Sequence, residues 1–173
     1  MTIIICPGVH SPELTQSFIQ SMQNTIGQNC LILPTEQYPP YSAIAITDWL
    51  KLQQLSKTQS LSLIAFSAGV VGAIGAANIW QLQGGKVQSF IAFDGWGMPL
   101  AGDFPIYRVS HDYFTHYSSG ILGAGESGFY AEPEVEHLEL WRSPDTCWGW
   151  QIITSGLKAR CFLTDYIQYI LKS

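Results

Sequence analysis

The sequence predicts an α/β domain in which a doubly wound, mostly parallel sheet of about six strands carries helices on both faces. Apolar runs of strand length recur along the chain between turn signals. The first four runs are continuous rather than alternating, which is typical of strands that are buried on both faces of a parallel sheet. Segments with helical spacing lie between the runs, so strand and helix alternate as in a doubly wound domain.

Six apolar runs have the length of a strand and end at turn residues. They lie at residues 2–6, 30–34, 61–66, 87–93, 105–110 and 137–141. The first four belong at the centre of the sheet because they are apolar throughout.

Three segments show helical spacing. The first follows Ser11, a candidate N-cap, and places Pro12 at its first helical position. In all three, apolar side chains recur every three or four residues and mark one face of a helix. They are Leu14, Phe18, Met22 and Ile26 in the first segment, Ala45, Trp49, Leu52 and Leu55 in the second, and Leu163, Tyr166, Ile167, Ile170 and Leu171 at the C-terminus.

Residues 111–133 interrupt this alternation. The segment is rich in Gly, Ser and Tyr and has no sustained period. Long irregular segments of compact domains are often lids or binding loops, and the alternative is a plain surface excursion. We therefore predict a single domain over residues 1–173, with an irregular loop or lid at about 111–133.

Composition excludes several classes of function. The chain has 173 residues, 47% of them hydrophobic, and a net charge of −5, which leaves no basic surface for a nucleic-acid partner. The N-terminal apolar run stops at Pro7 and lacks the basic region of a secretory signal, so we expect a cytoplasmic protein. The four cysteines are too scattered for a zinc site or a redox motif and are predicted to be small core residues. We predict neither a metal nor a cofactor.

An uncharged stretch runs from Lys57 to Lys86 and contains LSLIAFSAGVVGAIGAANIW, residues 61–80. It is long enough to cross a bilayer, which takes ~20 apolar residues. However, its character changes abruptly at Ser67, and no basic cluster or aromatic belt flanks it. We therefore predict a buried strand and a buried helix joined at Ser67, with no stable membrane insertion. The helix contains three glycines, which we expect to allow a close approach to the sheet.

The junction reads Ala65-Phe66-Ser67-Ala68-Gly69, which is the nucleophile elbow G-x-S-x-G with alanine in place of the first glycine. The dinucleotide-binding pattern G-x-G-x-x-G fits less well, because the glycines here are spaced G-x-x-G-x-x-G. With its elbow, the preceding strand and the small-residue helix, nearly the whole chain resembles the α/β-hydrolase family. It is most similar to small members with little or no cap, among them uncharacterised cyanobacterial proteins.

This resemblance implies a role for Ser67 as a nucleophile. It also implies an oxyanion hole made by the backbone N–H of Ala68 and by a second N–H from the loop after the first strand, from Val9 or His10. The other reading of that loop, Pro7-Gly8-Val9-His10, is an ordinary reverse turn.

In this family the acid and then the histidine follow the nucleophile along the chain. Asp94 and Asp112 each end a predicted strand, and either could also cap a helix. No histidine follows residues 137–141, and His137 would begin that strand at the wrong edge of the sheet. We therefore predict Asp94 with His111 as the base, and keep Asp112 and His116 as alternatives.

The resulting hypothesis is a serine hydrolase that cleaves a small apolar ester or thioester through an acyl-enzyme. Aromatic residues are the expected pocket walls, although each could also be a core residue. They are Trp96, Tyr113 and Phe114, with Tyr117 and Phe129. The alternative is a hydrolase-like binding or interaction protein without turnover, which the missing C-terminal histidine favours. The predicted partner is a small-molecule substrate.

Overall fold

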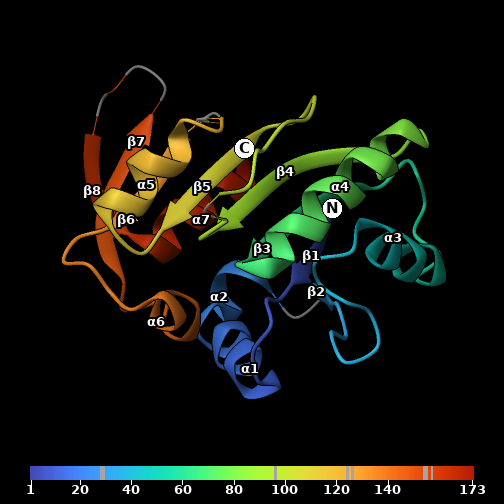
Figure 1. Cartoon of the computed structure of the whole chain (residues 1–173), viewed down its shortest axis with the longest axis horizontal. Helices are drawn as coiled ribbons and strands as arrows, with labels where there is room; N and C mark the ends of the chain where they lie inside the picture. The colour runs from blue at the N-terminus through green and yellow to red at the C-terminus, as the bar shows by residue number, and fades with distance from the viewer. Residues whose placement is uncertain (28–29, 96, 124, 126, 154–155, 157) are drawn as a thin grey trace.

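The computed structural model describes residues 1–27, 30–95, 97–123, 125, 127–153, 156 and 158–173. Within these residues, eight strands form one sheet and seven helices cover its two faces (Figure 1). The strands are β1 (Thr2–Cys6), β2 (Cys30–Ile32), β3 (Ser60–Phe66), β4 (Lys86–Phe93), β5 (Ile106–Ser110), β6 (Ser127–Ala131), β7 (Trp148–Ile153) and β8 (Lys158–Phe162). The helices are α1 (Pro12–Ser21), α2 (Gln23–Ile26), α3 (Ala43–Leu52), α4 (Ala68–Leu82), α5 (Tyr113–Gly120), α6 (His137–Arg142) and α7 (Leu163–Lys172).

The strand order is β2-β1-β3-β4-β5-β6-β7-β8. The first six strands pair in parallel, whereas β7 and β8 join antiparallel, so the sheet is mostly parallel but larger than the six strands expected. The chain order reverses at the β1–β3 pair, where Ile4 lies opposite Leu63. In open α/β sheets the crevice at such a reversal, outside the carboxyl ends of the strands, is the usual place for a ligand.

Two apolar layers hold the helices on the sheet. One contains buried residues of α3 and α4, and the other contains buried residues of α1, α2, α6 and α7. Helix α5 lies on the same side of the sheet as α3 and α4 (Figure 1). The predicted C-terminal helix is confirmed, with Tyr166, Ile167 and Ile170 buried. On α3, Ile46 and Trp49 are buried while Leu52 is exposed, so the apolar face predicted there is partly wrong.

The C-terminal half of the chain differs most from the prediction. Residues 137–141, expected as a strand, form most of α6, and the expected irregular segment contains α5 and β6. Strands β7 and β8 were not predicted because they lack a continuous apolar run, and β8 is largely exposed at the sheet edge. A five-residue run such as HLELW fits either period, and here Leu140 and Trp141 are buried while Leu138 is exposed, as in a helix.

Helix α4 contains the three glycines that were expected to face the sheet. Only Gly69 does so, since a Cβ there would overlap the backbone oxygens of Cys6 and Pro7 at the end of β1. Gly72 and Gly75 face α3 and the loop before it instead, near Pro40 and Ala43. Two of the three glycines therefore serve the contact of α4 with α3 and the loop before it. Among the described residues, no helix combines the length and the apolar character needed to cross a bilayer.

Gly72→Ala should destabilise the fold, while the same change at Gly120 should not. A Cβ at Gly72 would overlap the backbone oxygen of Pro40 and lie 2.8 Å from Ile46 Cδ1, and the backbone cannot yield easily. We expect a loss of about 1–3 kcal/mol in the free energy of unfolding. At Gly120, the last residue of α5, a Cβ meets nothing within 4 Å, so alanine should be neutral or stabilise by up to ~1 kcal/mol. Urea unfolding of both variants checks this pair, and equal losses would contradict it.

Candidate active site

Ser67 occupies a strained turn between β3 and α4. Its backbone has φ 52° and ψ −122°, a conformation that non-glycine residues rarely adopt and that costs about 1–3 kcal/mol. Its N–H donates to the carbonyl of Phe93 at 2.9 Å, which ties the turn to the end of β4. The neighbouring loop also leaves little room, because a Cβ on Gly8 would lie 3.1 Å from Ser67 Cβ. The Ser67 hydroxyl is thus held at the carboxyl edge of the sheet, as the elbow motif requires.

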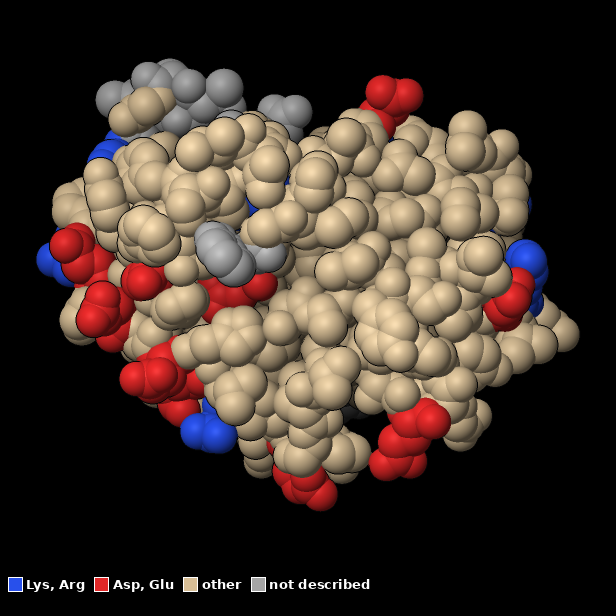
Figure 2. All heavy atoms as spheres, viewed as in Figure 1, with Lys and Arg blue, Asp and Glu red and all other residues tan. Residues whose placement is uncertain are grey.

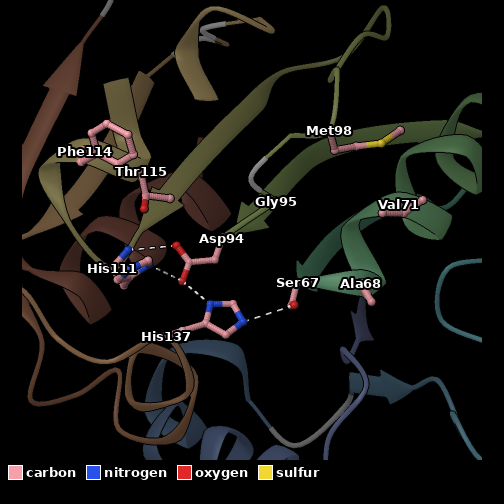
Figure 3. Close-up of a pocket in the computed structure, with 10 residues that line it drawn as sticks. All are labelled: Ser67, Ala68, Val71, Asp94, Gly95, Met98, His111, Phe114, Thr115 and His137. Atoms are coloured by element: carbon pink, nitrogen blue, oxygen red, sulfur yellow. Dashed lines mark hydrogen bonds and ion pairs between the residues drawn. The ribbon is translucent and has the colours of Figure 1, made fainter. Parts of the chain in front are cut away.

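His137 lies beside this hydroxyl. Its Nε2 is 3.2 Å from Ser67 Oγ, and its Nδ1 is 2.7 Å from Asp94 Oδ2 (Figure 3). The prediction that His137 would lie at the wrong edge of the sheet is wrong, because the residue begins α6 rather than a strand. The loop after β6 brings it back over the carboxyl ends of the strands.

His137 packs at the end of a series of aromatic rings. Its imidazole stacks on Phe66 with ring centroids 4.7 Å apart, and Phe66 in turn packs on Trp141 at 5.0 Å. Trp141 stacks on Phe18 of α1 at 3.6 Å. His137 and Trp141 are four residues apart and so share one face of α6. This i, i+4 spacing is the signal in the sequence that could have identified the histidine.

Asp94 follows β4 directly and is almost fully buried. Its backbone φ of 47° lies in the left-handed region, which aspartate and asparagine tolerate better than most residues. Burial opposes ionisation of this carboxyl, but hydrogen bonds from His111 and His137 and the charge of His111 outweigh it, so the pKa of Asp94 is lowered. The structure therefore places an ionised carboxylate next to the Nδ1–H of His137, at the position predicted from the sequence.

His111, the predicted base, contacts the acid rather than the serine. Its Nδ1 lies 2.9 Å from Asp94 Oδ2, and its backbone N–H donates to Asp94 Oδ1 at 3.0 Å. Among the described residues, His137 is the histidine that hydrogen-bonds with Ser67. The expectation that His111 would fill this position is therefore corrected: both histidines bond Asp94 Oδ2, and His137 is the one that also bonds Ser67.

The two alternatives, Asp112 and His116, have other roles in the structure. Asp112 is the N-cap of α5, and its Oδ1 accepts a hydrogen bond from the N–H of Thr115. His116 faces Gly128 of β6, and a Cβ there would overlap its ring. Burial, followed by the charges of Arg108 and Lys158, lowers the pKa of His116 to about 4. His116 is thus a neutral packing residue that lies away from Ser67.

A pocket of about 490 Å³ opens beside Ser67 (Figure 3). Its lining contains both polar and apolar residues. The polar and ionisable ones are Ser67, Asp94, His111, Thr115 and His137, and the others are Ala68, Val71, Gly95, Met98 and Phe114. Of the predicted wall residues, Phe114 lines the pocket, whereas Tyr113 packs on Tyr117 and Tyr130. Trp96 lies outside the described residues.

Of the predicted oxyanion donors, one lines the pocket and the other two candidates do not. Ala68 lines it and is the first residue of α4, where a backbone N–H has no intrahelical partner. Val9 and His10 are not among the lining residues, although Gly8 of the same loop lies against Ser67. The side chain of Val9 is exposed, and the ring of His10 bonds the carbonyl of Ser11. A second oxyanion donor from this loop stays a prediction.

Arg108 of β5 was not singled out in the sequence. Its buried guanidinium donates hydrogen bonds to the carbonyls of Met98, Leu122 and Gly123, and so joins two loops next to the pocket. Because Met98 is a lining residue, Arg108 helps to fix this part of the pocket wall. Burial lowers the pKa of this guanidinium.

The surroundings of the site are more acidic than basic. No Lys or Arg is among the described lining residues. The loop before α6 and α6 itself contain Glu132, Glu134, Glu136 and Glu139, and Figure 2 shows acidic side chains gathered at this end of the molecule. An anionic substrate would therefore find no Lys or Arg among the described lining residues and a negative surface beside the pocket.

One nitrogen each of His111 and His137 and one oxygen of Asp94 lie within 4.8 Å of one another, a spacing that a metal ion could use. In this structure those atoms are already paired with one another by hydrogen bonds. Such bonds need a proton on each imidazole nitrogen, whereas a metal needs the same nitrogen deprotonated. We therefore assign protons to these positions.

No profile of a known protein family matches the sequence, and neither does any curated protein. Among solved structures, the chain is similar to RedJ, a thioesterase from the prodiginine biosynthetic pathway in Streptomyces coelicolor, with 20% identity and a TM-score of 0.43. The matched region covers 59% of this chain and 41% of RedJ. The chemistry of the site is therefore inferred from its geometry.

Proposed function

We propose that this chain is a serine hydrolase that cleaves esters or thioesters through an acyl-enzyme on Ser67. One observation carries the proposal: His137 bridges the Ser67 hydroxyl and the Asp94 carboxylate, at 3.2 Å and 2.7 Å. A serine hydroxyl is a weak nucleophile until a base takes its proton, and this arrangement supplies the base and the group that orients it.

In the first half of the reaction, Ser67 Oγ attacks the carbonyl carbon while its proton passes to His137 Nε2. Asp94 holds His137 in the tautomer with hydrogen on Nδ1 and stabilises the imidazolium that forms. The tetrahedral intermediate places its oxyanion near the N–H of Ala68, with a second donor from Val9 or His10. Removal of one such donor typically costs ~10²–10³ in rate. His137 then gives its proton to the leaving alcohol or thiol, and the acyl group stays on Ser67.

In the second half, a water molecule takes the place of the leaving group. His137 accepts a proton from the water, whose oxygen attacks the acyl carbon, and returns that proton to Ser67 Oγ as the carboxylic acid leaves. The side chain of His137 is 40% exposed, so solvent water can reach it. Ester and thioester substrates are consistent with this sequence because each has a leaving group that accepts the proton.

The pocket favours a small, uncharged acyl group. Val71, Met98 and Phe114 add apolar surface to the lining, and no Lys or Arg is among the described lining residues to bind a carboxylate or a phosphate. At about 490 Å³ the pocket is within the usual range for small-molecule sites, ~300–1,000 Å³. A short apolar ester meets these conditions.

The alternative, a binding protein without turnover, depended on the lack of a histidine after the last predicted strand. His137 follows β6, the last parallel strand, and reaches Ser67. The absence of a histidine after residue 141 therefore no longer argues against turnover.

A fluorophosphonate probe tests the proposal without knowledge of the substrate. The probe should form a covalent phosphonyl adduct on Ser67 of the native protein, because it captures only a serine activated by a base. Ser67→Ala should show no adduct, and peptide mapping by mass spectrometry locates the label.

Ser17→Ala is the matched control, since the hydroxyl of Ser17 bonds a carbonyl of its own helix and Ser17 is not a lining residue of the pocket. This variant should be labelled as fast as the native protein. A native protein that stays unlabelled from neutral to mildly alkaline pH, or equal labelling of Ser67→Ala, would refute the hydrolase proposal.

A further inference from the structure

The carboxylate of Asp94 accepts more hydrogen bonds than the orientation of His137 requires. Its Oδ2 accepts from both His137 Nδ1, at 2.7 Å, and His111 Nδ1, at 2.9 Å. Its Oδ1 accepts from the backbone N–H of His111. The two imidazole rings lie edge to face with centroids 6.0 Å apart, and each directs its Nδ1 at the same oxygen of the acid (Figure 3). His111 is thus placed to act on the acid without touching the serine.

The groups around His111 favour its charged form. On one side Nδ1 meets Asp94, and on the other Nε2 lies 3.6 Å from Asp112 Oδ2. A neutral imidazole carries a proton on one nitrogen only, so it would turn an acceptor toward one of these carboxylates. A protonated ring offers N–H to both. Glu136, from the segment that leads into α6, adds a third negative charge.

We propose that His111 is a positioning residue that acts through Asp94. Its imidazole holds the carboxylate in the orientation that His137 needs, and its proton determines how much of the negative charge of Asp94 is left for His137. The proposal rests on the proposed serine-hydrolase function. When His111 is protonated, its positive charge and His137 both interact with the same oxygen of Asp94. With His111 neutral, the full charge stabilises the imidazolium that forms on His137 during acylation.

This arrangement sets the direction of the pH dependence. The hydrogen bond to Asp94 raises the pKa of His111 despite the opposing effect of burial, and the charges of Asp94, Asp112 and Glu136 raise it further. His111 therefore stays protonated to a higher pH than a free histidine. As the pH rises through this pKa the competing cation is lost, so the reaction of Ser67 should become faster. His111 then contributes an ionisation to the acid limb of the rate profile.

Two substitutions separate the hydrogen bond of His111 from its charge. In His111→Asn, the side-chain amide N–H can stand where Nδ1–H stood, so Asp94 keeps its donor while the titrating group is gone. His111→Ala removes both. The measured quantity is the second-order rate constant of fluorophosphonate labelling at Ser67 across a range of pH.

For His111→Asn we expect a labelling rate within a few-fold of the native rate at alkaline pH, and a ratio of variant to native rate that grows about ten-fold as the pH falls. For His111→Ala we expect labelling about ten-fold slower than that of His111→Asn at every pH, because one hydrogen bond to a charged group is lost. With a chromogenic ester, His111→Ala should lower kcat and leave KM nearly unchanged, since His111 acts on the reacting groups through Asp94.

The outcomes distinguish this inference from the proposed function. A native protein that is never labelled overturns both. Labelling on Ser67 with the same pH profile in the native protein and in His111→Asn overturns the role of His111 alone. If His111→Ala fails to fold, the profile of His111→Asn decides by itself, because that variant keeps the donor to Asp94.

Discussion

Replacement of Ser67 or His137 by alanine should lower kcat for a chromogenic ester by a factor on the order of 10⁴ or more, and the double variant should lose little beyond either single one. The two groups act as a unit: without the base the hydroxyl is inert, and without the hydroxyl the base has no proton to take. Their effects are therefore strongly non-additive. Steady-state rates of the two single variants and the double variant test this, with the melting temperature as a check on folding.

His137→Phe refines this test. A phenyl ring at this position can keep the stack on Phe66 but has no nitrogen atoms, so a loss of activity in this variant reflects the chemistry rather than the packing. His116→Ala should keep most of the activity, because His116 packs on β6 away from Ser67. If His137→Phe retained a tenth of the native rate while a His116 variant were inactive, His137 would not be the base.

Strand β3, the turn at Ser67 and the position of Asp94 could be predicted from the sequence because their signals are local. A continuous apolar run indicates a buried parallel strand, and the residue that follows it lies at the carboxyl edge of the sheet whatever the rest of the chain does. Ser67 and Asp94 both occupy this kind of position, after β3 and β4. Their adjacency follows from the direct pairing of these two strands.

The place of His137 could not be predicted in the same way. It depends on a short helix whose five-residue apolar run also fits a strand, and on ring contacts with Phe66 and Phe18, which are distant in the sequence. Strands β7 and β8 were missed for a related reason. They pair antiparallel at the edge of the sheet, where strands need no continuous apolar run. Because residues 137–141 were predicted to be the last strand, the base was expected after residue 141, whereas the histidine beside Ser67 is residue 137.

Asp94→Asn should lower kcat by a factor on the order of 10⁴ without unfolding the protein. Asparagine tolerates the left-handed backbone of this position, φ 47°, as well as aspartate does, so the turn after β4 should persist. The side chain is the same size, but one of its oxygens becomes an NH₂ group that cannot accept a hydrogen bond.

The amide has two orientations, and both disturb the site. If its oxygen faces the two imidazoles, its NH₂ meets the backbone N–H of His111, and two donors oppose each other. If the amide is flipped, its NH₂ faces His137 Nδ1 and favours the tautomer with hydrogen on Nε2, which cannot take the proton of Ser67. In neither orientation does a negative charge stabilise the imidazolium of His137. The rate should therefore fall steeply while the melting temperature changes far less.

Asp112→Asn makes the same chemical change at the neighbouring carboxylate. Asparagine caps a helix about as well as aspartate, so α5 should keep its N-cap at Thr115, and Ser67 and His137 keep their partner Asp94. We expect kcat within about ten-fold of the native value for this variant, since only a remote charge is lost. Equal losses in Asp94→Asn and Asp112→Asn would mean that the general negative charge near the histidines matters, rather than the contact of Asp94 with His137. A loss confined to Asp94→Asn would identify that contact as the one on which proton transfer from Ser67 depends.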